Sequence, residues 1–243
     1  MAGALEWNIN HGQRNARLFE IGHHYRLNGN KPVETRILTL GATGESREKN
    51  IYDTARDFSF ANLKGDLDAI GALSGGFRWG PGGPEFLHAA RRSKLFLGET
   101  EIGATGQLAK RVAEKLKLRQ DIFLAELNLG PVYCAYYGVK NARHYEPLPR
   151  FPAVERDFSL LVADYVTFAE ATKTIQSLGI AEIISIEAKD LFRGKNVPAG
   201  KYSLLLRVTF QSRETTLTDT QIAEFSATII SAMEKQLGAQ LRT

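Results

Sequence analysis

The chain has 243 residues, of which 43% are hydrophobic and 24% are charged, as is typical of one large globular domain or two ordinary ones. Its apolar runs are shorter than a membrane span, and residues 1–15 lack the apolar core of a signal peptide, so we expect neither insertion nor secretion. The single cysteine, Cys134, cannot form an internal disulfide, which fits a reducing cytoplasm. Its aromatic neighbours Tyr133 and Tyr136 favour a buried structural thiol.

The formal net charge of +4 is unevenly distributed along the chain. Residues 1–148 contain 20 Lys and Arg against 16 Asp and Glu, whereas residues 149–243 contain 11 of each. Any contact of the second part with a nucleic acid therefore depends on a local patch of cations rather than on a whole-domain field.

Taken in chain order, the first part mixes strands and short helices. Residues 17–27 and 33–40 predict two strands around a turn at 28–32. A helical stripe before Gly71 contains Phe60, Leu63, Leu67 and Ile70. Glycines predict loops at 75–76 and 80–84, and further elements are predicted as strands at 93–97, 101–106 and 121–127 and a basic helix at 107–116.

A change of domain is predicted near residue 148. Three prolines between residues 147 and 152 stiffen the chain and block regular backbone hydrogen bonding. We therefore divide the chain into domains 1–148 and 149–243.

The second part has a clear order of elements. Alternating apolar residues predict strands at 157–162, 183–189 and 202–211, with a short last strand at 239–241. Capping boxes at Thr167 and Thr218 open two helices, which Gly179 and Gly238 close. The apolar stripe of the second helix contains Ile222, Phe225, Ile229, Met233 and Leu237. The resulting βαββαβ order predicts a ferredoxin-like antiparallel sheet with both helices on one face and the other face open.

The open face and the hairpin beside it carry the candidate binding residues. If Leu204, Leu206 and their like-facing neighbours contact the helices, then Ser159, Ser203, Arg207 and Gln211 face outward. In the hairpin, Arg193, Lys195 and Lys201 can reach phosphates, and Phe192 can stack on a base. The simpler alternative is a sheet hairpin with charged tips and Phe192 in the core.

Several motifs resemble those of one family. They are Phe-Pro-Ala-Val-Glu-Arg-Asp at 151–157, Arg-Gly at 193–194, Pro-Ala-Gly-Lys at 198–201, Phe-Gln at 210–211 and Thr-Leu-Thr-Asp at 216–219. In the first part, Arg-Leu-Phe-Glu-Ile-Gly at 17–22 resembles the second strand of a class II synthetase core. Together they resemble the β subunit of bacterial phenylalanyl-tRNA synthetase. The chain departs from the family at Thr215, where a basic residue is usual, and Arg213 lies two positions earlier.

The resemblance implies an α+β chain: a partial, inactive class II synthetase-like antiparallel core over 1–148, then a ferredoxin-fold anticodon-binding domain over 149–243. It implies that the chain starts mid-domain, without the helix of the subunit interface. The implied partners are tRNA(Phe) and the α subunit of an α2β2 enzyme, with neither a membrane nor DNA. That enzyme uses ATP and Mg²⁺ to attach phenylalanine to tRNA on its α subunit, in the cytoplasm; no cofactor is expected on this chain alone.

The residues predicted to bind tRNA are the outward-facing and hairpin positions. They are Phe192, Arg193, Lys195, Lys201, Ser203, Arg207 and Gln211.

No catalytic or metal-binding residue is predicted. The sequence contains no phosphate-binding loop, nucleophile elbow or paired Cys–His motif. His23 and His24 are adjacent on a strand, so they point to opposite faces and have no further ligand at zinc-like spacing. Arg91 and Arg92 could touch a partner subunit or a phosphate, but a solvated basic turn is the expectation.

Two other functions stay open. The open sheet face could bind a partner protein or a small regulatory molecule without any enzymatic role, since this fold alone assigns no function. An independent enzyme on a class II core is disfavoured because no catalytic set is visible. Titration with tRNA and with an anticodon stem-loop would discriminate between these readings.

Overall fold

The computed structural model describes residues 1–141, 148–194 and 197–242, and the chain divides into two compact units, Met1–His144 and Tyr145–Thr243. Lys195 and residues 142–147, which include part of the proline-rich boundary segment, lie outside the described residues. Within the described part, no helix is long and apolar enough to cross a membrane.

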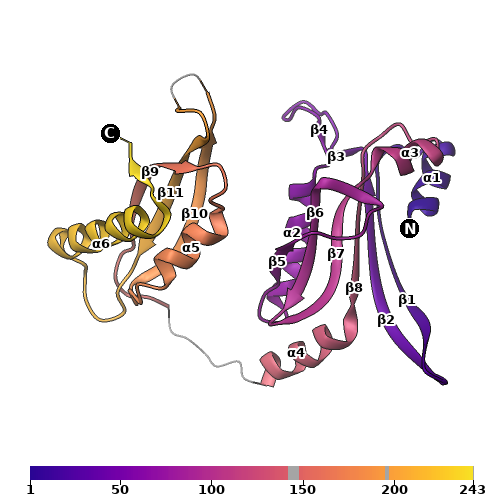
Figure 1. Cartoon of the computed structure of the whole chain (residues 1–243), viewed down its shortest axis with the longest axis horizontal. Coiled ribbons are helices and arrows are strands. Elements are labelled where there is room, and N and C mark those ends of the chain that lie inside the picture. Colours follow the sequence, from indigo (N-terminus) through magenta and orange to yellow (C-terminus); the bar gives the residue numbers. More distant parts are fainter. Residues whose placement is uncertain (142–147, 195–196, 243) are drawn as a thin grey trace. The chain divides into compact units, whose positions relative to one another are not determined.

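Unit 1 is built on a six-stranded antiparallel sheet (Figure 1). Its strands, in hydrogen-bonded order, are β1 (Ala16–Asn28), β2 (Lys31–Thr43), β8 (Ile122–Asn128), β7 (Thr100–Leu108), β6 (Leu87–Leu97) and β5 (Arg78–Pro81). A separate small sheet pairs β3 (Glu45–Arg47) with β4 (Arg56–Asp57).

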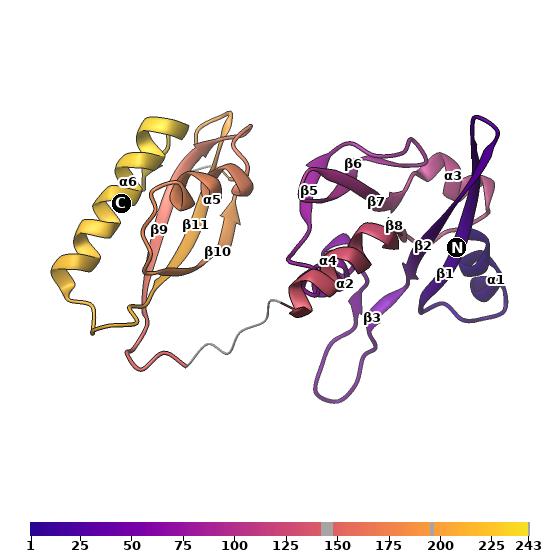
Figure 2. The same cartoon turned by 90° about the horizontal axis from the view of Figure 1, so that it is seen from below.

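Helices cover one face and one end of this sheet. Helices α2 (Phe60–Ala72) and α4 (Leu129–Asn141) pack on one face through a cluster that includes Leu63, Leu67 and Val132 (Figure 2). Helices α1 (Ala2–Asn10) and α3 (Lys110–Lys115) pack through a second cluster, in which Leu5, Leu108, Leu118 and Ile122 are buried. The face opposite α2 and α4 is covered only in part, near α1, and the rest of it is available to line a cavity.

Several predictions for unit 1 are wrong in detail. Gly80 belongs to β5 rather than to a loop, and α3 begins only at Lys110 because the preceding residues complete β7. Arg91 and Arg92 lie in β6 rather than in a basic turn; the Arg91 guanidinium donates to Gln107 Oε1 at 2.6 Å, and that of Arg92 donates to the Pro84 carbonyl.

Helix α4 is not among the predicted elements, and it carries a Gly130-Pro131 pair in its first turn. Proline is nevertheless tolerated in the first turn of a helix, where its missing N–H has no intrahelical acceptor to lose. Leu129 and Val132 point into the core, and Cys134 lies on the other side of α4. Cys134 is therefore exposed, and the expectation of a buried thiol is wrong.

Unit 2 has the predicted βαββαβ order. Its elements are β9 (Val154–Ala163), α5 (Phe168–Gln176), β10 (Ile183–Phe192), β11 (Lys201–Phe210), α6 (Asp219–Leu237) and β12 (Gln240–Leu241). The sheet is antiparallel in the order β10-β11-β9-β12, and both helices share one buried cluster against one of its faces (Figure 2). The α+β class and the ferredoxin-like fold are confirmed.

Both helices of unit 2 begin at the predicted capping boxes. The Thr167 hydroxyl accepts from the Glu170 N–H, and the Thr218 hydroxyl accepts from the Gln221 N–H, with the reciprocal bonds also present. Helix α6 ends at Gly238, whose φ of +60° is the left-handed conformation that glycine adopts most easily.

The caps generate a stability prediction. Replacing Thr218 by Ala should lower the free energy of unfolding of unit 2 by about 1 kcal/mol, because the first turn of α6 loses its side-chain acceptor. Both tryptophans, Trp7 and Trp79, lie in unit 1, so the loss should appear in the far-UV circular dichroism transition and not in tryptophan fluorescence.

The matched control for this substitution is Thr228→Ala on an exposed position within α6. Alanine has the higher helix propensity there, so the control should unfold like the parent or slightly later. An equal loss in both variants would contradict a capping role for Thr218.

Candidate functional site

The open face of the unit 2 sheet is organised by its central strand, β11. Leu204, Leu206, Val208 and Phe210 are at most 1% exposed on the helix side. The residues between them face the other way, as predicted, and pair across the sheet with open-face residues of β9 and β10.

A hollow of about 340 Å³ lies on this open face. Its lining residues come from three strands and the C-terminal segment: Ser159, Asp190, Phe192, Ser203, Leu205 and Arg242. Phe192 is 46% exposed, so it is not a core residue. Ser203 faces outward as predicted but is only 7% exposed, because its cross-strand partners Phe192 and Leu161 flank it.

An irregularity in β10 brings Phe192 and Asp190 to this face. Ala188 pairs with Leu206, but the next pair is Asp190 with Leu205, so one residue is skipped between them. Such a bulge reverses which face the following residues occupy. Without it, even-numbered residues of β10 would continue to face the helices. Asp190 and Arg242 are therefore absent from the predicted site. Strict alternation along β10 would place Asp190 on the helix side, and no pattern in the sequence places Arg242 beside β10.

Arg207 is fully engaged in ion pairs on this face. Its Nε and Nη2 atoms donate to the two carboxylate oxygens of Asp157 at 2.7 and 2.8 Å, and its Nη1 lies 2.7 Å from Glu155 Oε2. The hydrogen bond from Arg207 lowers the pKa of Asp157, and the same bond raises the pKa of Arg207. Two carboxylates already hold Arg207, and its contact with a phosphate stays a prediction.

The other described cations of the predicted site also have partners. The Arg193 guanidinium pairs with Asp164 and lies over the Tyr202 ring, with its Cζ atom 4.8 Å from the ring centroid. Lys201 Nζ donates to Gln240 Oε1 at 3.1 Å. Gln211 does not project freely either: its Nε2 donates to the Phe151 carbonyl at 2.7 Å and so anchors the segment before β9.

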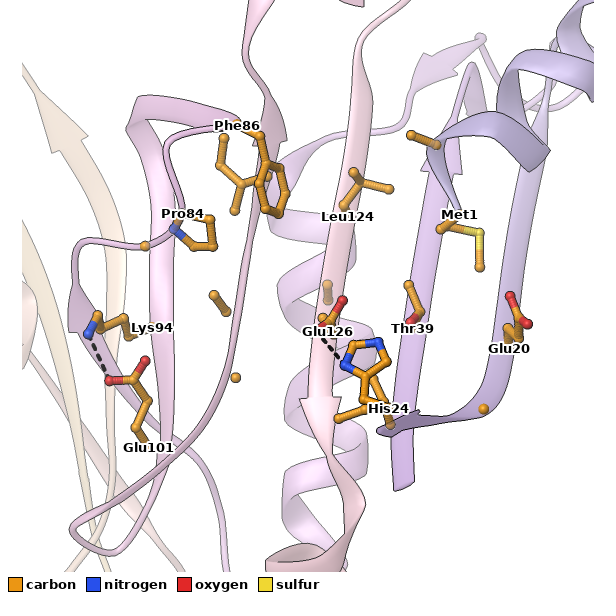
Figure 3. A pocket seen from close by; sticks show the side chains of 18 of the residues that line it. Met1, Glu20, His24, Thr39, Pro84, Phe86, Lys94, Glu101, Leu124 and Glu126 are labelled. Atoms are coloured by element: carbon orange, nitrogen blue, oxygen red, sulfur yellow. Dashed lines mark hydrogen bonds and ion pairs between the residues drawn. The ribbon is translucent and has the colours of Figure 1, made fainter. Parts of the chain in front are cut away.

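A larger cavity, of about 830 Å³, lies on the face of the unit 1 sheet opposite α2 and α4, where Met1 and Ala2 at the start of α1 also line it (Figure 3). Carboxylates from three strands line it: Glu20, Glu101 and Glu126. Lys94 pairs with Glu101 at 2.7 Å, and Phe86 and Leu124 supply apolar walls. The charges that face this cavity are therefore mainly negative.

The two adjacent histidines have separate partners. His23 Nε2 lies 3.5 Å from Glu34, and His24 Nδ1 lies 3.9 Å from Glu126. Among the described residues, no group of three or more His, Cys, Asp or Glu side chains is arranged to hold a metal ion.

Comparison with known proteins identifies both units. Residues 149–242 match the ferredoxin-fold anticodon binding domain, a class of module whose fold the unit 2 sheet and helices have. Residues 1–129 match the phenylalanyl tRNA synthetase beta chain CLM domain. The chain belongs to the phenylalanyl-tRNA synthetase beta chain family.

The chain is also similar to named relatives. It is 32% identical over 241 residues to the phenylalanine–tRNA ligase beta subunit of Carboxydothermus hydrogenoformans, and 29% identical over 244 residues to that of Streptococcus pneumoniae. These matches cover 97% and 98% of this chain but only 30% of each relative. The crystal structure of pyrrolysyl-tRNA synthetase from Desulfitobacterium hafniense overlaps 56% of this chain and 48% of its own, with 14% identity and a TM-score of 0.40, which is too loose an overlap to add evidence.

The Arg207 ion pairs generate a pH prediction. Replacing Asp157 by Asn should lower the melting temperature of unit 2 at neutral pH, because Arg207 loses its bidentate acceptor. The folded-state pKa of Asp157 is lowered from 3.8, so its stabilisation is complete above 3.8 and is lost as the pH falls through that lowered pKa. The difference between variant and parent should therefore shrink below pH 3.8.

Thermal melts followed by circular dichroism between neutral pH and acid would measure this. Asp190→Asn is the matched control, since within the described residues its carboxylate has no cation in ion-pair distance. It should show little difference from the parent at neutral pH. A deficit of the Asp157 variant that persists unchanged in acid would argue against the ion pair as its cause.

Proposed function

We propose that this chain contributes tRNA(Phe) anticodon recognition to a phenylalanine–tRNA ligase, as part of its beta subunit. The observation that supports this most directly is the hollow on the open face, where an exposed aromatic ring lies beside a carboxylate, a hydroxyl and a guanidinium. Membership of the family and the match of residues 149–242 to an anticodon-binding domain support the same role.

An unpaired base is the ligand that suits this hollow. Phe192 offers a ring face on which a base can stack. The Asp190 carboxylate accepts from base N–H groups, the Arg242 guanidinium donates to base acceptors, and the Ser203 hydroxyl does either. A volume of about 340 Å³ is at the small end of ligand sites, so it suits a single base rather than a paired stem.

The other predicted residues divide into two roles in this proposal. Lys201 keeps two ammonium N–H groups beyond its bond to Gln240, and Arg193 retains donors that do not face Asp164, so both can approach a phosphate. Arg207 and Gln211 hold the sheet and the segment before it. Lys195 stays a prediction, outside the described residues.

We further propose that the chemistry belongs to the α subunit of an α2β2 enzyme that uses ATP and Mg²⁺ in the cytoplasm. The unit 1 cavity does not fit ATP, because its described lining contains no arginine to clamp the triphosphate. Its lysine, Lys94, is already paired with Glu101. In this proposal unit 1 provides contacts to the α subunit rather than a reaction site.

Titration with an anticodon stem-loop tests the proposed role. Phe192→Ala should weaken binding of a tRNA(Phe) anticodon stem-loop by about 1–3 kcal/mol, because the base loses its stacking platform. Leu191→Ala is the matched control: Leu191 is similarly exposed but pairs with Leu204, on the opposite face of the sheet. Fluorescence anisotropy at low salt would measure both affinities.

The outcome separates the proposal from its alternative. Saturable binding that depends on the anticodon sequence and on Phe192 supports RNA recognition. Failure of the parent chain to bind the stem-loop at low salt, where phosphate contacts are strongest, would favour a protein- or small-molecule-binding module.

A second prediction concerns catalysis. The purified chain should give no phenylalanine-dependent exchange of pyrophosphate into ATP, because the described lining of its cavity has no arginine to hold the triphosphate. An intact α2β2 enzyme of a relative is the positive control. Exchange above background by this chain, abolished by Lys94→Ala, would overturn the assignment of chemistry to the α subunit.

A further inference from the structure

The surface around α3 is rich in exposed cations that the proposed function does not use. Between residues 110 and 119, five exposed cations accompany a single carboxylate, Glu114. We call these five residues the α3 basic surface: Lys110, Arg111, Lys115, Lys117 and Arg119. The surface accounts for much of the positive charge of unit 1.

Most of these cations have no acidic partner. Lys110 Nζ lies 3.9 Å from Glu114, and Arg111 Nη2 donates to the Glu85 carbonyl at 2.9 Å. Within the part of the chain that the structure describes, no carboxylate lies in ion-pair distance of Lys115, Lys117 or Arg119. The contrast with the unit 2 sheet is direct, since Arg193 and Arg207 are paired there.

Lys117 is held in an unfavourable backbone conformation. Its φ of +53° is the only positive φ of a residue other than glycine in the described chain. The Lys117 N–H donates to the Glu114 carbonyl, and the Leu118 N–H donates to the Ala113 carbonyl, which is the hydrogen-bond pattern of a helix end that usually has glycine at this position. Glycine would adopt this conformation without the steric cost that a lysine incurs.

The fold does not account for the lysine. Helix α3 is anchored by Val112, Leu116 and buried Leu118 in the cluster shared with α1. A cation near a helix C-terminus is favourable, but Lys115 in the last turn already supplies it. A residue kept in a strained conformation that the packing does not require points to a functional constraint.

We propose that the α3 basic surface is a second RNA-binding site, which contacts backbone phosphates without reading bases. Exposed lysines and arginines without carboxylate partners are the groups that replace counterions along a nucleic-acid backbone. The adjoining turn adds Arg14, because the Arg14 carbonyl accepts from Gln120 Nε2 at 3.0 Å and so keeps this turn beside the surface. The choice of RNA over another polyanion rests on the proposed function.

The test uses the full chain and a short RNA duplex that has no anticodon loop. Replacing Lys115, Lys117 and Arg119 by Gln should weaken duplex binding at least tenfold at about 50 mM salt, and should reduce the slope of log K against log salt by about 2–3. The matched control replaces three exposed cations elsewhere in unit 1, Arg26, Lys31 and Lys49, by Gln. It should change duplex binding less than threefold.

Lys117→Gly separates function from folding. It should raise the melting temperature of unit 1, because glycine relieves the positive φ, and should also weaken duplex binding about two- to fivefold. A purely structural role for Lys117 cannot give both a more stable protein and weaker binding.

The two RNA sites fail separately. Phe192→Ala should leave duplex binding unchanged. If the parent chain binds the duplex but shows no dependence on the anticodon, the proposed function is refuted and the α3 site is not. Equal duplex affinity of the triple Gln variant and the parent would overturn the inference. So would preferential binding of poly-glutamate at equal charge, which would assign the surface to an acidic protein.

Discussion

The two-residue alternation of β11 is the constraint on which unit 2 depends. This strand pairs with both β9 and β10 at the centre of the sheet, so its alternate side chains must satisfy opposite environments. One set is apolar and buried beneath α5 and α6, and the other holds Ser203, Leu205 and Arg207 on the open face. A shift of one residue would bury the Arg207 guanidinium and expose Phe210, which makes the register of the whole domain strongly specified.

The elements of unit 2 that the sequence predicts correctly are those with a regular and local pattern. The capping boxes of α5 and α6, the stripe of α6 and the alternation in β9 and β11 each follow from interactions within a few residues, and each is present in the structure. Alternation failed in β10, because a bulge depends on pairing with another strand and leaves no mark in the sequence. That failure falls at Asp190 and Phe192, where the hollow is formed.

Unit 1 was harder to predict, for related reasons. Its long strands are predicted from alternation, but the glycines at 80–84 predict a loop where pairing with β6 continues β5 through Gly80, and no pattern predicts α4 at Leu129–Asn141. The exposure of Cys134 follows from the direction in which α4 packs, which neighbouring residues do not reveal. Carboxylates from three strands that lie far apart in the sequence line the cavity, so no local motif predicts it.

The distribution of ion pairs has a consequence for specificity. Phosphate contacts attract any nucleic acid, whereas contacts to base edges discriminate among sequences. On the unit 2 face, Asp157 and Glu155 neutralise Arg207, and Asp164 pairs with Arg193, so the general attraction for polyanions is weak there. In the proposed role, the remaining favourable interactions on this face are stacking and hydrogen bonding at the hollow. An unpaired base can make both interactions, whereas the paired bases of a duplex are not accessible to them. In the proposed role, a neutral domain is suited to reading bases because carboxylates already hold two of its cations, Arg193 and Arg207.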